Sequence, residues 1–246
     1  MRSVAVVFVL TLSMVYAAGP AVAAEVVVGR FNASASQPPA PWRIIRFDRK
    51  VPATAYRVIT WDGVQAVEAR ADASMALIAR PIDLDLVKTP ILCWRWRIEA
   101  PLKKADMTKK SADDYAARVY VTFKLPSQTL TLAERSRRAL ARQMFGADVP
   151  DAAINYVWDN RKPIGTRLPS PYMNQSEMIV LRSGGKDAGR WVSQRRDLLA
   201  DATQTFGTTD FRATLIAIGS DTDNTRETAH AGFAELRFVS RDMSCE

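Results

Sequence analysis

The sequence predicts a single, mainly β domain built as a sandwich of two sheets. Short segments that alternate apolar and polar residues follow one another along the chain, separated by turn residues such as Asp62-Gly63. Helical periodicity is convincing in one segment alone, residues 129–145, so the chain lacks the regular strand–helix alternation of a βαβ protein. A chain of 246 residues with 48% hydrophobic residues suits one large all-β domain.

Strand patterns recur along the chain. Alternation, short apolar runs and the turn residues between them predict strands at residues 25–31, 42–47, 54–60, 64–71, 75–79, 90–98, 118–123, 154–158, 177–182, 211–219 and 232–238. Residues 191–206 are expected to begin extended and to turn helical near residues 196–201. The helix at residues 129–145 ends at Gly146 and has a basic outer surface, and we expect it to pack on the sheet rather than lie on a membrane.

The N-terminal segment has the character of a signal peptide. Arg2 gives a positive start, residues 4–18 are apolar almost throughout, and residues 21–24 offer a small-residue cleavage site. The apolar stretch is too short for a comfortable membrane span, although a retained anchor is the alternative, and no second candidate span follows. We expect a signal peptide at residues 1–24 and an exported, periplasmic β-sandwich domain at residues 25–246.

The composition of the chain limits which binding partners and which catalytic mechanisms are plausible. The net charge of +8 and the pI near 9.7 suit an anionic envelope component or an acidic polymer, or simply keep the protein in solution. No nucleic-acid-binding motif is present. His230, Cys93 and Cys245 are too few for a zinc site or for a histidine-based nucleophilic mechanism. An oxidising compartment would permit the two cysteines to pair, but the sequence does not show whether their sulfurs meet.

Residues 90–98 form the strongest strand pattern. Two tryptophans at alternate positions could stack on a sugar, but their apolar neighbours favour a place in the core. Arg95 and Arg97 stand on the opposite face and are candidates for contact with a ligand. The apolar face consists of Leu92, Trp94, Trp96 and Ile98.

Residues 111–123 place two adjacent carboxylates, Asp113 and Asp114, in front of a strand. Arg118 and Tyr120 share the polar face of that strand, opposite an apolar face. A carboxylate beside a guanidinium keeps its charge, while two neighbouring carboxylates raise each other's proton affinity. Such a cluster could do acid–base work, hold a cation or brace the strand. Asp113, Asp114 and Tyr120 are the catalytic candidates if the protein is an enzyme.

Two further constellations end predicted strands. Asp221, Asp223 and Asn224 are candidate calcium ligands, because calcium takes several hard oxygen ligands, although the segment lacks the glycine and distal glutamate of an EF-hand and could be a plain turn. No other cofactor is expected. The second constellation is Tyr156, Trp158, Asp159 and Asn160. Its aromatic rings could stack on a carbohydrate or simply fill the core.

Five segments occur in a specific order along the chain. They are residues 94–96, 105–108, 113–123, 155–160 and 221–225. Together they resemble the uncharacterised bacterial family catalogued as domain of unknown function 3047, over nearly the whole mature chain. The resemblance implies an exported antiparallel β-sandwich, a jelly roll similar to carbohydrate-binding and lectin-like folds, and it supplies no activity.

Three functions are consistent with the sequence. The leading hypothesis is a periplasmic binding module for a glycan or another anionic envelope ligand, with Arg95, Arg97, Arg118 and Tyr120 on one polar sheet face. The first alternative is a carboxylate-based glycoside hydrolase or polysaccharide lyase that uses the paired acids, with Asp221 as a second acid, or Tyr120. The second alternative is an envelope assembly or interaction factor.

Overall fold

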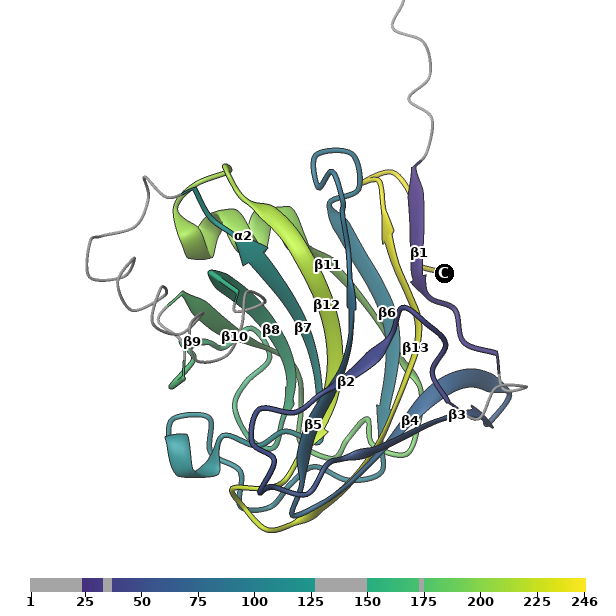
Figure 1. The fold of residues 1–246 in the computed structure, drawn as a ribbon, viewed down its shortest axis with the longest axis vertical. Coiled ribbons are helices and arrows are strands. Elements are labelled where there is room, and N and C mark those ends of the chain that lie inside the picture. Colours follow the sequence, from purple (N-terminus) through teal and green to yellow (C-terminus); the bar gives the residue numbers. More distant parts are fainter. Residues whose placement is uncertain (1–23, 33–36, 127–149, 173–174) are drawn as a thin grey trace, which may run out of the picture.

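The computed structural model describes residues 24–32, 37–126, 150–172 and 175–246, which form two β-sheets packed face to face (Figure 1). The first sheet, called sheet A, contains β1 (Glu25–Gly29), β3 (Ala55–Trp61), β4 (Val64–Asp72), β6 (Ile91–Ile98), β11 (Val192–Asp197) and β13 (Thr228–Val239). The second sheet, called sheet B, contains β2 (Arg43–Ile45), β5 (Met75–Pro81), β7 (Ala117–Lys124), β8 (Ala152–Asp159), β9 (Arg167–Pro169), β10 (Ser176–Ser183) and β12 (Arg212–Asp221).

Successive strands wind from one sheet to the other. Sheet A has the order β11-β6-β13-β4-β3, with β1 beside the C-terminal half of β13, and sheet B has the order β2-β5-β12-β7-β8-β10-β9. The chain therefore changes sheet at each step from β4 to β7 and again from β10 to β13. This winding makes the β-sandwich a jelly roll and confirms the predicted fold class. Among the described strands the pairings are antiparallel except for β8 with β10, which is parallel.

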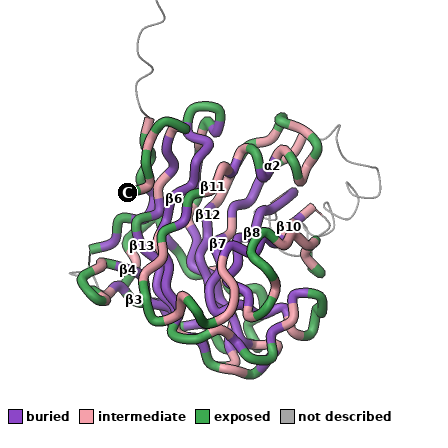
Figure 2. The backbone as a smooth tube through the Cα atoms, turned by 180° about the vertical axis from the view of Figure 1, so that it is seen from behind, coloured by how far each residue is buried: buried purple, intermediate pink, exposed green. Residues whose placement is uncertain are grey.

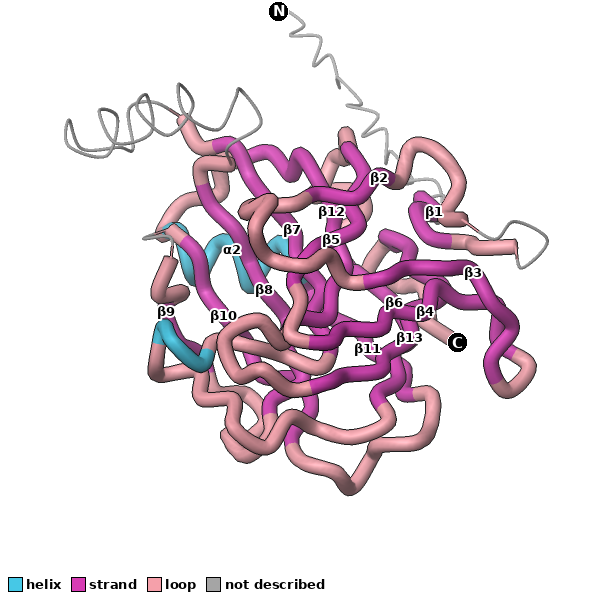
Figure 3. The backbone as a smooth tube through the Cα atoms, turned by 60° about the horizontal axis from the view of Figure 1, so that its bottom comes forward, coloured by secondary structure: helices cyan, strands magenta, loops and turns pink. Residues whose placement is uncertain are grey.

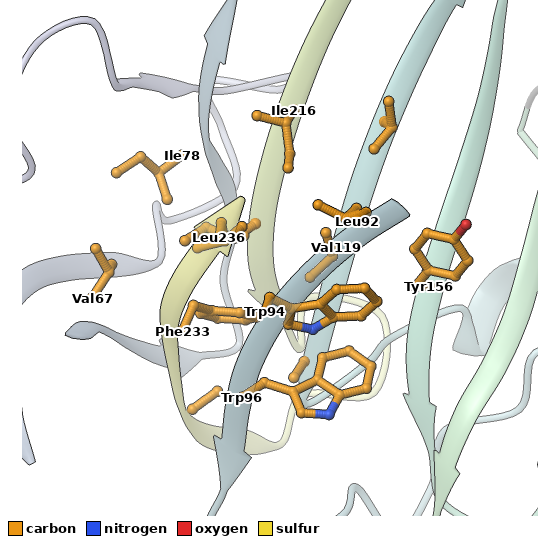
Figure 4. Close-up of a cluster of buried hydrophobic side chains, with 14 of the residues drawn as sticks. Val67, Ile78, Leu92, Trp94, Trp96, Val119, Tyr156, Ile216, Phe233 and Leu236 are labelled. Atoms are coloured by element: carbon orange, nitrogen blue, oxygen red, sulfur yellow. The ribbon is translucent and has the colours of Figure 1, made fainter. Parts of the chain in front are cut away.

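Large aromatic side chains fill the space between the sheets (Figure 4). Trp94 and Trp96 extend from β6 toward Tyr156 on the facing β8, and the ring centroids of Trp94 and Tyr156 lie 5.4 Å apart. Trp94 and Trp96 are 1% and 0% exposed, so the prediction that they fill the core is confirmed. Figure 2 shows the same pattern for the whole fold, with buried residues along the strands and exposed residues at the turns.

A bulge keeps the core face of β13 apolar despite uneven spacing. Phe233, Leu236 and Phe238 are all fully buried, although the first two are three residues apart. The pairing of β13 with β6 shifts register between Ala234 and Arg237, and Glu235 within this step has a φ of +55°. The extra residue restores the phase of the alternation and leaves Glu235 exposed on the outer face of sheet A.

The described helix α2 (Leu198–Phe206) follows β11 directly and lies beside β8 (Figure 3). Asp197 caps it by accepting a hydrogen bond from Ala200 N at 2.9 Å, and Gly207 ends it in the left-handed conformation. Its position agrees with the helical turn expected near residues 196–201. The helix predicted at residues 129–145 lies outside the described residues. A three-residue 3-10 helix, η1 (Lys110–Ala112), precedes β7.

The ends of the described chain are tied to sheet A. A disulfide joins Cys93 in β6 to Cys245, which answers the question that the sequence left open. Within the described ranges, no helix combines the length and the apolar character needed to cross a membrane.

Candidate functional site

The four residues expected to form one polar ligand face lie on opposite sides of the sandwich. Arg95 and Arg97 alternate with the core tryptophans of β6 and therefore stand on the outer face of sheet A. Arg118 and Tyr120 alternate with core valines of β7 and therefore stand on the outer face of sheet B. Because the core separates the two pairs, the prediction of a shared face is wrong. Sequence alternation shows which residues share a strand face but not which strands share a sheet.

Arg97 is committed to contacts within the protein. Its guanidinium pairs with Asp62 and, at 2.9 Å, with Glu99, and it lies 4.3 Å from the centre of the Trp61 ring. Only 8% of Arg97 is exposed. Its charge is balanced and its cation–π contact is made with Trp61, so Arg97 positions that ring rather than meeting a ligand.

Arg95 is half-buried and has one acidic partner among the described residues. Its guanidinium lies 3.3 Å from the Glu235 carboxylate and 5.8 Å from the centre of the Trp191 ring. Trp191 meets Trp61 edge-on with 6.0 Å between centroids, and Trp191 Nε1 donates a hydrogen bond to the Trp61 carbonyl at 2.9 Å. Gly232 lies against both rings, because a Cβ there would come 2.7 Å from Trp191 and 3.1 Å from Trp61. The outer face of sheet A therefore carries two half-buried tryptophans over one glycine.

The buried carboxylate of Glu68 supports the same face. It accepts hydrogen bonds from Arg57, from Arg70 at 3.1 Å and from His230 at 2.7 Å when the His230 ring is protonated at Nε2. Burial alone would raise the pKa of Glu68, but these hydrogen bonds outweigh it and lower the pKa to about 2. His230 in turn stacks on Trp61 with 4.3 Å between ring centroids.

A groove of about 650 Å³ opens on this face beside Arg95. Arg30, Arg95 and Arg237 line it together with a single acid, Glu235. Arg237 also pairs with Glu25 at 3.3 Å, whereas Arg30 is exposed and has no ion-pair partner among the described residues. The groove, called the cationic groove below, thus carries an excess of positive charge.

At one end of sheet B, two of the predicted constellations form a single acidic cluster. Asp113 and Asp114 precede β7, while Asp221 ends the neighbouring strand β12 and Asp223 lies just beyond it. One carboxylate oxygen from each of Asp114, Asp221 and Asp223 lies within 4.8 Å of the other two. The antiparallel pairing of β7 with β12 brings these acids together although about a hundred residues separate them in sequence.

Hydrogen bonds fix most of this cluster. Asp114 accepts from Thr225 N at 2.7 Å and from Asn224 Nδ2 at 3.0 Å. Asp113 accepts from the hydroxyl of its neighbour Tyr115 at 2.9 Å. In Asp221, Oδ2 pairs with Arg118, whereas Oδ1 is buried without a partner among the described residues.

Three carboxyl groups of the cluster have raised pKa values. Burial raises the pKa of Asp113 and raises that of Asp221 well above its usual value, with the neighbouring carboxylates adding to the rise at Asp221 and Arg118 opposing it. Burial and Asp114 also raise the pKa of Asp223. The site therefore favours uptake of positive charge, either as protons or as a cation.

The catalytic candidates are poorly placed for contact with a large substrate. Asp113, Asp114 and Asp221 are 4%, 1% and 2% exposed. Tyr120 is half-buried, and burial raises the pKa of its hydroxyl. An acid that acts directly on a glycosidic bond must lie within hydrogen-bond reach of it, which such burial opposes.

The aromatic constellation at the end of β8 stabilises the fold. Tyr156 and Trp158 are 0% and 2% exposed and belong to the core. Asp159 accepts hydrogen bonds from the backbone N–H groups two and three residues further on, and Asn160 Nδ2 donates to the Ala105 carbonyl at 2.9 Å. The buried rings leave no open ligand site at these four residues, which corrects their assignment as a binding surface.

Tyr156 also belongs to an internal ionic network that the sequence did not suggest. Its hydroxyl donates to Asp201 of α2 at 2.8 Å. Asp201 further accepts from Arg196 at 2.7 Å and from Arg167 at 2.9 Å. The network joins α2 to both sheets.

The sequence reasoning missed Trp61, Trp191, Arg30 and Arg237. A signal existed for Trp61, because Tyr56 and Val58 are core residues of the same strand and Trp61 falls on the opposite, outer phase. No comparable signal marked Trp191 or the arginines, which meet through the pairing of β1, β6, β11 and β13.

Fold and site together define a jelly-roll β-sandwich with a cationic groove on one outer face and an acidic cluster at the end of the opposite sheet. The chain belongs to the family described as "Protein of unknown function (DUF3047)", whose model matches residues 40–237. A comparison with curated proteins found no match.

Solved structures of similar outline are glycoside hydrolases. A metagenome-derived family 12 endoglucanase has a TM-score of 0.43 and 13% identity, over 89% of this chain and 98% of its own. Endoglucanase 3 of Trichoderma harzianum, also from family 12, has a TM-score of 0.41 and 7% identity, over 91% of this chain and 99% of its own. The xyloglucanase domain of NopAA from Sinorhizobium fredii, solved with cellobiose, has a TM-score of 0.39 and 11% identity, over 82% and 97%. Similarity at this level assigns no activity to this chain.

Proposed function

We propose that this protein is an exported binding module whose cationic groove takes an acidic polysaccharide. The observation that carries the proposal is the groove itself, about 650 Å³ in volume and lined by three arginines against one glutamate. Small-ligand sites span roughly 300–1,000 Å³. The groove is therefore large enough for a short segment of a polysaccharide.

The charge of the groove selects an anionic ligand. Guanidinium groups match carboxylate, sulfate and phosphate geometry with two parallel hydrogen bonds. Arg30 is exposed and without an ion-pair partner among the described residues, and Arg95 has one exposed partner, so both can turn toward a ligand. The net charge of +8 would attract a polyanion over a longer range.

Trp191 and Trp61 give the surface its second component. Both rings are half-buried, and Trp191 stands next to Arg95, which lines the groove. Aromatic rings beside polar groups are suited to the apolar faces and hydroxyls of sugars. We therefore favour an acidic glycan over a simple inorganic anion.

Export is part of the proposal. The signal-peptide character of residues 1–24 motivates it, and the Cys93–Cys245 disulfide supports it because such cross-links persist mainly in oxidising compartments.

Calorimetric titration with galacturonate oligomers tests the proposal, with uncharged malto-oligosaccharides as the reference ligand. Binding should be confined to the acidic oligomer and should weaken with added salt. Arg95→Gln should weaken binding at least about tenfold, because one charge-assisted hydrogen bond contributes about 1.5–3 kcal/mol. Lys124→Gln removes the same charge from an exposed position on β7 of the other sheet and should leave affinity unchanged. Equal affinity for both ligands, or equal losses in the two variants, would refute the assignment.

A carboxylate-based hydrolase or lyase is the second candidate. The raised pKa values of Asp113 and Asp221 favour it, since a general acid must hold its proton near neutral pH. The near-complete burial of both side chains weighs against it. Release of reducing ends from acidic glycans, lost in Asp113→Asn and Asp221→Asn variants that still fold, would establish this alternative in place of a binding module.

A further inference from the structure

We propose that the acidic cluster binds one divalent cation, calcium by its chemistry, through Asp114, Asp221 and Asp223. The site is independent of the cationic groove, because it lies at one end of sheet B while the groove lies on the outer face of sheet A.

The spacing of the carboxylates fits a single ion. Calcium lies 2.3–2.6 Å from its oxygen ligands, so two oxygens bound to one ion are at most about 5 Å apart. The three carboxylate oxygens lie within 4.8 Å of one another. Small rotations of the side chains would bring all three oxygens onto one ion without rearrangement of the backbone.

An unpartnered oxygen points to what the cluster lacks. Only 2% of Asp221 is exposed, and its Oδ2 pairs with Arg118. Its Oδ1 has no partner among the described residues. A buried acceptor without a donor is costly, and a cation held by Oδ1 would remove that cost while Arg118 keeps Oδ2.

The charge balance of the cluster leads to the same conclusion. Among the described residues, four carboxylates, Asp113, Asp114, Asp221 and Asp223, meet one buried guanidinium, that of Arg118, and the exposed Arg226 also acts on Asp223. When all of these groups are ionised, the cluster holds two more negative than positive charges, which a divalent cation would offset. The donors are all oxygens, which selects a hard ion such as calcium rather than a thiophilic metal.

Hydrogen bonds hold two of the three proposed ligands in place without the ion. Thr225 N and Asn224 Nδ2 fix the Asp114 carboxylate, and Asp221 N donates to the Tyr115 carbonyl at 3.1 Å. Ion binding would therefore meet a largely preorganised site, with little ordering entropy to oppose it.

Titration of the chelator-treated full chain with calcium chloride tests this inference, with heat of binding and melting temperature as readouts. The expected result is one ion per chain and a melting temperature that rises by roughly 5–10 °C at a hundredfold excess over the dissociation constant. Asp223→Asn removes a half-buried ligand and should weaken binding at least about tenfold. Asp210→Asn, an exposed acid near the far end of β12, should bind like the unaltered protein.

Two results would overturn the inference. One is the absence of both heat and thermal stabilisation with calcium, magnesium and manganese, which would mean that protons alone neutralise the cluster. The other is calcium binding that Asp223→Asn leaves intact. Arg95→Gln, which tests the groove, should leave calcium binding unchanged, so the two proposals can fail separately.

Discussion

Gly232 is the position where a single methyl group should disturb the proposed ligand surface without removing any charge. A Cβ at residue 232 would lie 2.7 Å from Trp191 Cη2 and 3.1 Å from Trp61 Cε3. Real Cβ atoms essentially never show contacts under 3.0 Å, so Gly232→Ala must displace the Trp191 ring, and the Trp61 ring must give way by a few tenths of an ångström. Because Arg95 lies over the Trp191 ring, displacement of Trp191 should also move this groove arginine.

The loss of folding stability in Gly232→Ala is the difference between two opposing effects. Overpacking of a close-packed site costs about 1–3 kcal/mol. Loss of the backbone freedom of glycine in the unfolded chain returns about 0.4–1 kcal/mol. A net loss of about 0.5–2 kcal/mol should lower the melting temperature by roughly 2–6 °C in a chain of this size.

Gly185→Ala is the matched control. A Cβ there would meet only Pro101, at 3.8 Å, which is an ordinary van der Waals contact. Thermal melting, tryptophan fluorescence and titration with galacturonate oligomers should therefore change in Gly232→Ala and stay at the level of the unaltered protein in Gly185→Ala. If the two variants melt together and bind alike, the packing of Trp61 and Trp191 over Gly232 does not support the groove.

Three further predictions concern stability. Serine in place of both Cys93 and Cys245 removes a cross-link with a sequence separation of 152, and chain entropy predicts a loss of about 5 kcal/mol in the free energy of unfolding. An unchanged midpoint of guanidinium unfolding would contradict this. Glu68 has a folded-state pKa of about 2 against 4.5 when unfolded, so its contribution to folding stability is present above pH 4.5 and is lost as pH falls toward 2. Glu68→Gln should therefore flatten the dependence of stability on pH across that window. An equally steep dependence would argue against the hydrogen bonds to Glu68. Asp201→Asn should destabilise by about 3 kcal/mol in urea unfolding, since Arg196 loses its carboxylate partner and Arg167 keeps Glu177 alone. A loss below about 1 kcal/mol would show that the network is dispensable.

The sequence predicted most strands of the fold because each shows either alternation that reveals its core face or, as at residues 211–219, an almost wholly apolar run. The Trp94 and Trp96 strand is the clearest case, since Leu92 and Ile98 share its apolar phase. The prediction missed β9, which has three residues in a proline-rich segment and no alternation to read. The parallel pairing of β8 with β10 could not be predicted either, because strand order depends on contacts between segments that are distant in sequence.

The candidate site could be predicted only in pieces. Asp114 and Asp221 were each recognised as acids at a strand end, but their meeting depends on the pairing of β7 with β12. Arg95 was recognised as outward-facing, whereas its neighbours in the groove come from β1 and the segment after it, from the start of β4 and from β13. Local alternation gives the face of a residue, while the residues that share a site follow from the topology of the whole sandwich.

The most direct test of the proposed function is to locate the ligand on the protein. Backbone amide shifts followed by NMR during titration with a galacturonate hexamer should change at Arg30, Gln65, Arg95 and Arg237 around the cationic groove. Residues 113–118, on the other sheet, should not respond. Shifts confined to residues 113–118 and Asp221, with the groove unaffected, would place the ligand at the acidic cluster and contradict the account.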